Sequence, residues 1–142
     1  MDSSKYIEEI LEINTENKDA CLRFLTLFKG LYNQDDIKCI VEHSNYLIYI
    51  TSHDNPVAFS LVRLRSKKKG KILDILLACA FHNYAKTIAD SLCNYAVKYN
   101  YPFSYVSPRT PELRKTFIKY GFEPICGIEG INEVLEKEIE SL

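Results

Sequence analysis

The sequence has no excess of positive or of negative charge, and it has no long apolar run. Lysine and arginine number 18 against 19 aspartates and glutamates, which gives a formal net charge of -1. Nucleic-acid-binding domains usually carry a clear basic excess, so we expect no nucleic-acid partner. No apolar run approaches the ~18 residues of a membrane-spanning helix, and the acidic N-terminal segment does not resemble a signal peptide. The sequence therefore predicts no membrane partner.

Closely spaced cysteine pairs are missing too. The five cysteines are odd in number, form no Cys-x-x-Cys pair and lie in apolar segments. This distribution favours reduced, buried thiols over disulfides or a zinc site. We therefore predict a cytoplasmic protein with no bound metal.

Glycine is scarce, with five residues in the 142-residue chain, and none lies between Gly70 and Gly121. Glycine permits positive φ and close approach of a ligand to the backbone, which makes it common in phosphate-binding loops. A phosphate site in this interval has to be built from other residues.

The remaining composition, 46% hydrophobic and 26% charged, is that of an ordinary globular chain. No linker, repeat or low-complexity segment divides it, so we predict one domain over residues 1–142. Alternating and apolar runs predict strands at 6–13 (or a short helix there), 45–51, 57–65, 71–80, 103–106, 122–126 and 132–139. Periodic apolar stripes predict helices at 16–29, 35–41, 83–98 and 110–120. This order predicts an α/β fold, with a mixed central sheet of about six to seven strands and helices on both faces.

The stretch from Thr110 to residue 125 is the most informative one. Thr110 is a good N-cap, Pro111 suits the first helical position, and Glu112 complements the positive end of the helix dipole. Gly121 stands where a helix-ending glycine is expected, and Phe122 opens an extended segment. The pattern predicts a short capped helix that leads directly into a strand.

This stretch, TPELRKTFIKYGF, and the later Leu135-Glu-Lys-Glu-Ile139 resemble two segments of the GNAT superfamily (general N-acetyltransferases). Members often carry Asn-Pro-x-Ala-x-x-x-Tyr-x-x-x-Gly-Phe, followed by a strand of the form (Met/Leu)-Glu-Lys-x-(Leu/Ile). The resemblance extends to the order of elements along essentially the whole chain. It implies a GNAT-like fold, acetyl-CoA or another acyl-CoA as co-substrate, and transfer of the acyl group to the amine of a small molecule or peptide. The sequence does not determine whether the protein forms a homodimer.

The resemblance, together with the chemistry of the residues, gives a set of predicted site residues. Asp74 is predicted to be the base that deprotonates the amine, and Tyr120 the acid that protonates the departing thiolate. The strand backbone is expected to pair with the pantetheine arm, and the amides that open the long helix are expected to hold the pyrophosphate. The positions expected to bind acyl-CoA are Leu77, Ala78, Ala80, His82, Asn83, Tyr84, Ala85, Lys86, Thr110 and Phe117.

Two departures from the family pattern bear on activity. The family's phosphate cradle, (Arg/Gln)-x-x-Gly-x-(Gly/Ala), falls on residues 80–85, where Ala80 replaces the cation or amide and Asn83 replaces the first glycine. Asparagine tolerates positive φ better than most residues, so we expect a weakened cradle. Phe117 stands where many members carry a tyrosine that resembles a general acid, and Tyr120, one turn later, is the predicted substitute.

Each assignment has a plainer alternative. Asp74 is otherwise a carboxylate at the solvent-facing start of its strand, Tyr120 a core residue, and Lys86 a solvated surface lysine. Arg109 either meets a phosphate or an acidic substrate, or points into water. For the whole protein, the alternatives to an acyltransferase are an inactive descendant that binds CoA or a protein, and an unrelated α/β domain. The sequence does not identify the amine.

Overall fold

The structure is a computed structural model that describes residues 6–28, 30, 32–67, 70–128 and 133–139. It contains a seven-stranded sheet in the order β1-β2-β3-β4-β5-β7-β6. The strands are β1 (Tyr6–Glu12), β2 (Tyr46–Ser52), β3 (Asn55–Lys67), β4 (Gly70–Ala80), β5 (Phe103–Val106), β6 (Glu123–Cys126) and β7 (Val134–Glu138). The helices are α1 (Lys18–Leu25), α2 (Gln34–Glu42), α3 (Ala85–Lys98) and α4 (Pro111–Lys119), with 3-10 turns η2 (Thr26–Phe28) and η3 (His82–Tyr84). Among the described strand pairs, β4 and β5 are the one parallel pair, so the predicted mixed sheet is confirmed.

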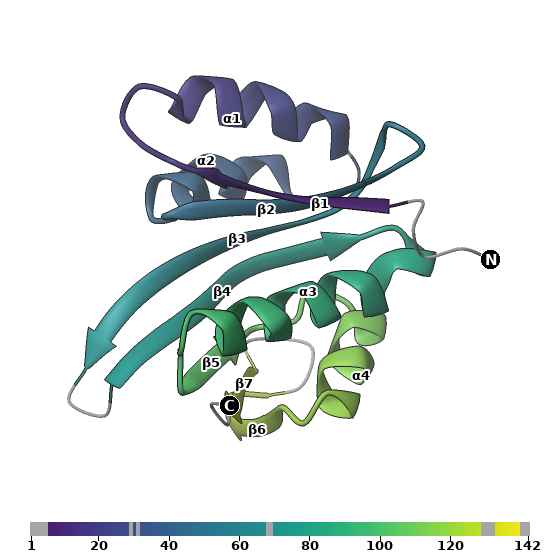
Figure 1. The fold of residues 1–142 in the computed structure, drawn as a ribbon. Coiled ribbons are helices and arrows are strands. Elements are labelled where there is room, and N and C mark those ends of the chain that lie inside the picture. Colours follow the sequence, from purple (N-terminus) through teal and green to yellow (C-terminus); the bar gives the residue numbers. More distant parts are fainter. Residues whose placement is uncertain (1–5, 29, 31, 68–69, 129–132, 140–142) are drawn as a thin grey trace.

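Helices cover both faces of the sheet, as predicted (Figure 1). The core under α1 and α2 includes Phe28 and Phe59, whose ring centroids are 4.7 Å apart. The core under α3 and α4 includes Ile88 and Leu92 of α3, together with Leu73 of β4. Among the described helices, none combines the length and the apolarity needed to cross a membrane.

The first helix is shorter than the predicted span 16–29. Asn14 Oδ1 accepts the N–H groups of Glu16 and Asn17 at 2.9 and 3.1 Å, and Asn17 Nδ2 donates to the carbonyl of Glu12 at 2.7 Å. These bonds hold the segment as a turn, so α1 begins only at Lys18. The preceding segment, for which strand and helix were both open, is the edge strand β1.

The short helix before Gly121 forms as its sequence predicts. Thr110 Oγ1 accepts the N–H of Leu113 at 3.2 Å, and Pro111 occupies the first helical position. Gly121 has φ +97°, a conformation that side chains disfavour, so the chain turns there out of α4. Phe122 then packs edge-on against Phe117 with centroids 5.1 Å apart, which fixes α4 against the start of β6.

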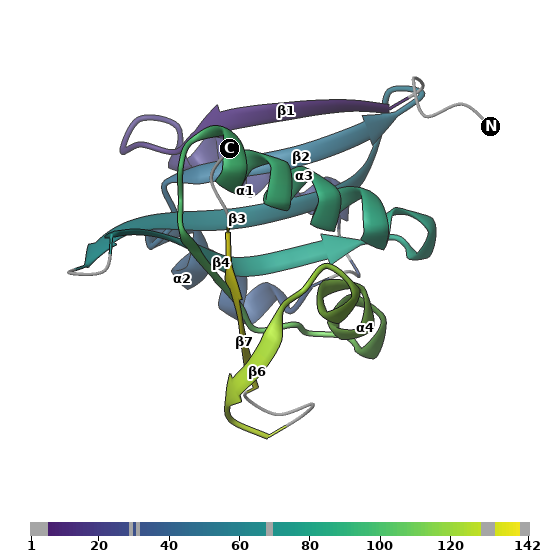
Figure 2. The ribbon, with the colours of Figure 1, turned by 60° about the horizontal axis from the view of Figure 1, so that its bottom comes forward.

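The sheet divides halfway along β4. The parallel register with β5 ends at the pair of Ile75 and Val106, whereas β4 continues to Ala80. At this point the register with β3 shifts by one residue, so Leu76 has no partner on β3 and forms a β-bulge. Figure 2 shows β7, which pairs with β5, crossing the direction of β3 and β4 steeply. Beyond the pair of Ile75 and Val106, β4 is no longer paired with β5. We call the place where this pairing ends the β4–β5 fork.

Candidate active site

A cavity of about 520 Å³ lies beside the β4–β5 fork, and we call it the fork-side cavity. Its lining combines aliphatic side chains with six polar or charged residues: Arg63, Arg65, Asp74, Tyr105, Ser107 and Arg109. Strand alternation places the charged part of this lining. Phe59 and Leu61 of β3 face α1 and α2, so Arg63 and Arg65 continue that face. The cavity is therefore on the α1 and α2 side of the sheet.

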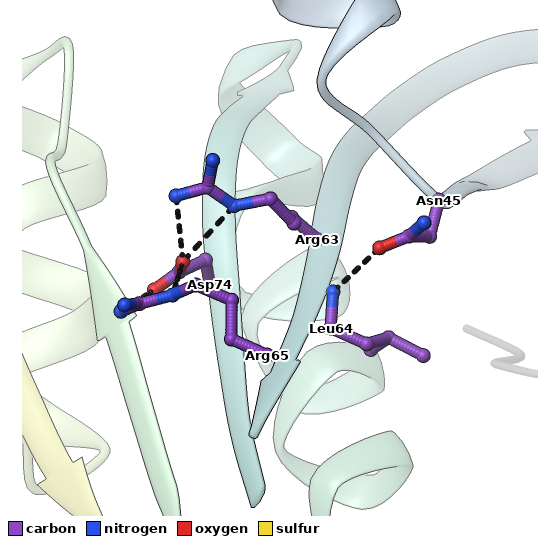
Figure 3. A network of polar contacts seen from close by, with 5 residues as sticks. All are labelled: Asn45, Arg63, Leu64, Arg65 and Asp74. Atoms are coloured by element: carbon purple, nitrogen blue, oxygen red, sulfur yellow. Dashed lines mark hydrogen bonds and ion pairs between the residues drawn. The ribbon is translucent and has the colours of Figure 1, made fainter. Parts of the chain in front are cut away.

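Asp74 is the centre of a group of ion pairs in this cavity (Figure 3). Arg63 Nε and Nη2 donate to Asp74 Oδ2 at 3.3 and 3.1 Å. Arg65 Nη2 donates to Oδ1 at 2.9 Å, and Arg65 Nε donates to Oδ2. The hydrogen bond to Asp74 raises the pKa of Arg65. The Asp74 side chain is only 9% exposed, so the alternative of a solvent-facing carboxylate is wrong.

The face of Asp74 follows from its neighbours in the strand. Leu73 and Ile75 belong to the core under α3 and α4, so Asp74 between them points to the opposite face. Its Cα partners are Arg63 on β3 and Tyr105 on β5. These three residues therefore form one polar row across the sheet, and Asp74 lies two positions before the Leu76 bulge.

Glu136 of β7 extends this row, because it is the Cα partner of Tyr105 on β5. A side-chain hydrogen bond to Glu136 raises the pKa of Tyr105, and burial adds to this effect. The Tyr105 hydroxyl therefore stays protonated at neutral pH, and it is hydrogen-bonded to the Glu136 carboxylate.

Arg109 enters the cavity from the loop between β5 and α4. Its Nη1 lies 3.9 Å from Asp36 Oδ2 at the start of α2, and its side chain is 47% exposed. It also acts electrostatically on Cys79 of β4. Burial raises the pKa of Cys79 to about 12, and the Arg109 charge opposes this shift only in part. Cys79 is therefore a protonated thiol at neutral pH and has little nucleophilic character.

The predicted phosphate cradle lies at the beginning of α3, where η3 precedes the helix. The Tyr84 N–H donates to the Phe81 carbonyl at 2.8 Å, which closes the 3-10 turn. Asn83 has negative φ, so its tolerance of positive φ is not used. The N-cap residues of η3 and α3, Phe81 and Tyr84, make no side-chain capping hydrogen bond. Asn83 and Lys86 are exposed, Tyr84 packs at the border of the core, and the His82 side chain lies outside the described part.

Tyr120 lies at the C-terminal end of α4 and against α3. Its hydroxyl is 3.4 Å from the carbonyl of Lys86 and 3.5 Å from Asp90 Oδ1. Burial raises its pKa, and Asp90 contributes to the same shift. Phe117 is fully buried, and the Thr110 hydroxyl is engaged in capping.

The structure thus separates the two predicted catalytic residues. Asp74 faces α1 and α2, whereas Tyr120 belongs to the layer of α3 and α4 on the other side of the sheet. Leu77, Ala78 and Ala80 lie between these layers, on the half of β4 beyond the fork. Between them, the pairing of β4 with β5 is interrupted at the fork.

Several residues of the cavity were not singled out from the sequence, and Arg63 and Arg65 are the charged ones. Arg63 and Arg65 belong to an alternating strand and have the pattern of ordinary solvent-facing charges. One pattern in the sequence could have identified them. The two arginines are two residues apart on one strand, and the next strand contains the isolated carboxylate of Asp74. An acid within a mostly apolar strand requires a partner when it is buried.

No protein-family model matches this chain, and no curated protein sequence matches it significantly. Its structure is similar to that of an N-acetyltransferase from Staphylococcus aureus Mu50, with a TM-score of 0.61, 11% identity, and 94% of this chain and 98% of the other covered. It is similar to arylalkylamine N-acetyltransferase 2 from Aedes aegypti, with a TM-score of 0.64, 10% identity, and 94% and 99% covered. It is also similar to Arabidopsis thaliana Naa50, solved with the bisubstrate analogue CoA-Ac-MVNAL, with a TM-score of 0.58, 17% identity, and 92% and 98% covered.

These likenesses extend over nearly the full length of both chains, and they agree with the α/β order and the mixed sheet described above. At these low identities they establish the architecture and leave the chemistry to be argued from the residues. The chain has the fold of the GNAT N-acetyltransferases.

Proposed function

We propose that this protein transfers an acyl group from acetyl-CoA or another acyl-CoA to an amine. The observation that carries the proposal is the β4–β5 fork at the Leu76 bulge. Beyond Ile75, the β4 edge that faced β5 has no strand partner within the described sheet. Buried backbone N–H and C=O groups require partners, and an extended ligand with amide groups can add to such an edge as a strand does. The pantetheine arm is an extended diamide of this kind, and Leu77, Ala78 and Ala80 would bind it.

The beginning of α3 supports binding of the pyrophosphate. The first N–H groups of a helix have no partner within the helix, and here neither N-cap residue, Phe81 or Tyr84, supplies a side-chain cap. Together with the helix dipole they favour an anion. The exposed Lys86 in the first turn of α3 adds a cation at a position where the dipole alone disfavours one. Naa50, one of the similar structures, was solved with a bisubstrate analogue that contains CoA, which supports a CoA thioester as the co-substrate here.

The reaction requires few groups from the protein. The amine nitrogen forms a bond to the acyl carbon and gives up one proton to water, the C–S bond breaks, and the CoA sulfur leaves as a thiolate that takes up a proton. A thiol has a pKa near ~8.5, so the thiolate is a good leaving group even without help. A proton donor typically contributes ~10²–10⁴-fold, and we assign this role to Tyr120. Asp74 was predicted to be the base, but four guanidinium hydrogen bonds already occupy its oxygens.

The second candidate function is an inactive module that binds CoA or a protein. It is favoured by Phe117, which occupies the expected position of the acid and is buried in the core, and by the engaged oxygens of Asp74. The transferase and the CoA-binding form of the inactive module both retain the acyl-CoA site, so binding and turnover have to be measured separately. A cytoplasmic location and the absence of a nucleic-acid partner remain predictions from the sequence.

Calorimetric titration with acetyl-CoA tests the site, and release of free CoA in the presence of a panel of amines tests turnover. We expect saturable binding that weakens in Lys86→Gln, with Lys38→Gln on α2 as the matched control. Binding without turnover of any amine favours the inactive module. No heat and no thermal shift at millimolar acetyl-CoA would contradict the transferase and the CoA-binding module, and would leave only a module that binds a protein.

A further inference from the structure

The described lining of the fork-side cavity is positively charged, although the whole protein has a formal net charge of -1. Arg63, Arg65 and Arg109 contribute three guanidinium groups, and Asp74 contributes the one carboxylate of this lining, which leaves a formal charge of +2. Asp36 approaches Arg109 from α2 only to 3.9 Å, and its side chain is 53% exposed. Solvent therefore screens this pair, and it removes little of the excess.

The guanidinium groups retain donors that Asp74 does not use. Arg63 and Arg65 bind Asp74 through Nε and Nη2, and within the described residues Nη1 of each has no partner. Arg109 makes no hydrogen bond to a described residue. The three side chains are 39%, 29% and 47% exposed, so a ligand in the cavity can reach them.

A purely structural role does not account for this arrangement. One guanidinium balances the charge of Asp74, and each further one adds repulsion in a partly buried place. Arg109 comes from a separate loop and is not required to pair Asp74. Positive charge that is brought together from two parts of the chain is favourable when an anion binds between the groups.

We propose that the fork-side cavity binds an acceptor amine that also carries a carboxylate or phosphate group, and that Arg109 together with Arg63 and Arg65 binds this acid group. This inference rests on the proposed acyl transfer. Guanidinium groups match the geometry of carboxylates and phosphates with two parallel hydrogen bonds. Asp74 holds two of them in fixed orientations, which reduces the entropy lost on binding. The acceptor amine then lies beside the Leu76 bulge, where the fork admits the thioester.

Matched amines test this specificity. Glycine is compared with glycinamide, and O-phosphoethanolamine with ethanolamine, as acceptors of the acetyl group from acetyl-CoA. We expect at least about tenfold higher kcat/KM for the acid-bearing member of one pair, because charge-assisted hydrogen bonds are the strong ones. The pair that shows the preference tells a carboxylate from a phosphate. Equal rates within both pairs, or faster transfer to the neutral members, would overturn the inference.

Variants locate the preference in the cavity. We expect Arg109→Gln to raise KM for the preferred acceptor about tenfold, and Arg109→Lys less, because lysine keeps the charge and loses the paired donors. The Kd of acetyl-CoA should not change. Arg23→Gln removes the same charge from an exposed position on α1 and should leave all constants unchanged. An Arg109→Gln variant that discriminates as well as the parent contradicts the assignment.

A binding measurement separates this inference from the proposed function. N-Acetylglycine and N-acetylglycinamide are titrated by calorimetry without CoA, and so are the N-acetylated forms of the phosphate pair. Binding of an acid ligand alone, in a protein that does not bind acetyl-CoA, would overturn the transferase and leave the anion site standing. Turnover of acetyl-CoA without any preference for an acid ligand would overturn the anion site and leave the transferase standing.

Discussion

Arg65 of β3 and Asp74 of β4 are nine residues apart in the chain and meet across their hairpin, with Arg65 Nη2 2.9 Å from Asp74 Oδ1. Arg63 binds the same carboxylate from two positions earlier on the same face. Asn45 fixes the end of β3 nearby, because its Oδ1 accepts the N–H of Leu64 at 2.8 Å (Figure 3). The carboxylate thus aligns two guanidinium groups at the edge of a cavity, immediately before the sheet divides.

The first prediction concerns the contribution of this group to stability. Asp74→Asn keeps the shape of the side chain and leaves Arg63 and Arg65 side by side without their counter-charge. We expect the free energy of unfolding to fall by about 1–3 kcal/mol, less than for a fully buried pair because both arginines are partly exposed. Urea denaturation measures it. Asp36→Asn, at the exposed pair with Arg109, should lose less than about 1 kcal/mol. Equal losses in the two variants would count against a structural role for the buried group.

The second prediction concerns the catalytic role of Asp74. Loss of a general base lowers kcat by ~10²–10⁴ and removes one limb of the pH–rate profile, with little effect on KM. Loss of a residue that positions Arg63 and Arg65 raises KM for the acceptor instead. Because the oxygens of Asp74 are engaged, we expect Asp74→Asn to raise KM and to leave the shape of the profile unchanged. A lost limb with unchanged KM would restore the base assigned from the sequence.

The features that the sequence predicted well depend on neighbouring residues. The cap at Thr110 and the turn at Gly121 follow from side-chain chemistry within one helical turn, and β5 has the predicted bounds. The start of α3 was predicted two residues too early. There the 3-10 bond from Tyr84 to Phe81 competes with the helix, and periodicity does not distinguish the two turns.

The charged part of the candidate site was not predictable in the same way. The pairing of Asp74 with two arginines depends on the register between β3 and β4, which the length of their hairpin sets. The bulge at Leu76 depends on the shift in this register, and no residue type marks it. The face of the sheet on which Asp74 lies depends in turn on which of the two hydrophobic cores contains its neighbour Leu73. Each of these is a contact between strands, so a pattern along one strand does not contain it.

The third prediction concerns acid stability through Glu133, which precedes β7. Arg114 of α4 donates from Nε and Nη2 to its oxygens at 2.6 and 3.1 Å, and this hydrogen bonding lowers the pKa of Glu133 below its ordinary 4.5. A carboxyl group with a lowered pKa in the folded state stabilises the fold fully above its unfolded pKa. That stability is lost as the pH falls through the folded pKa.

We therefore expect Glu133→Gln to be less stable than the parent at neutral pH, with a difference that shrinks as the pH falls below 4.5. Chemical denaturation at a series of pH values from 7 to 3 measures both curves. Glu16→Gln, at an exposed position before α1, is the control and should follow the parent. A difference between Glu133→Gln and the parent that is constant over this range would show that the Arg114 contact contributes nothing through charge.

The fourth prediction concerns thiol reactivity. Burial raises the pKa of Cys21 above its ordinary value and that of Cys79 to about 12, whereas Cys39 and Cys126 are exposed. Only the thiolate reacts with iodoacetamide, so the exposed pair should be alkylated first at pH 8, and the buried pair only after unfolding. Peptide mass spectrometry at timed intervals gives the order. Alkylation of Cys79 at the rate of Cys39 would mean that the core around β4 is open.

The last prediction concerns Tyr120 as the proton donor. Its hydroxyl bonds to Lys86 and Asp90 are long, at 3.4 and 3.5 Å, so Tyr120→Phe should change the free energy of unfolding by less than about 1 kcal/mol. If the proton of Tyr120 reaches the departing thiolate, the same variant should lower kcat by at least about tenfold, with the Kd of acetyl-CoA unchanged. Tyr99→Phe, at an exposed tyrosine after α3, is the matched control. The decisive comparison is between acetyl-CoA and an acyl donor with a leaving group of lower pKa, such as an acyl thiophenol ester of comparable size. A leaving group that needs no proton should respond much less to Tyr120→Phe, and equal losses with both donors would assign Tyr120 to the core instead.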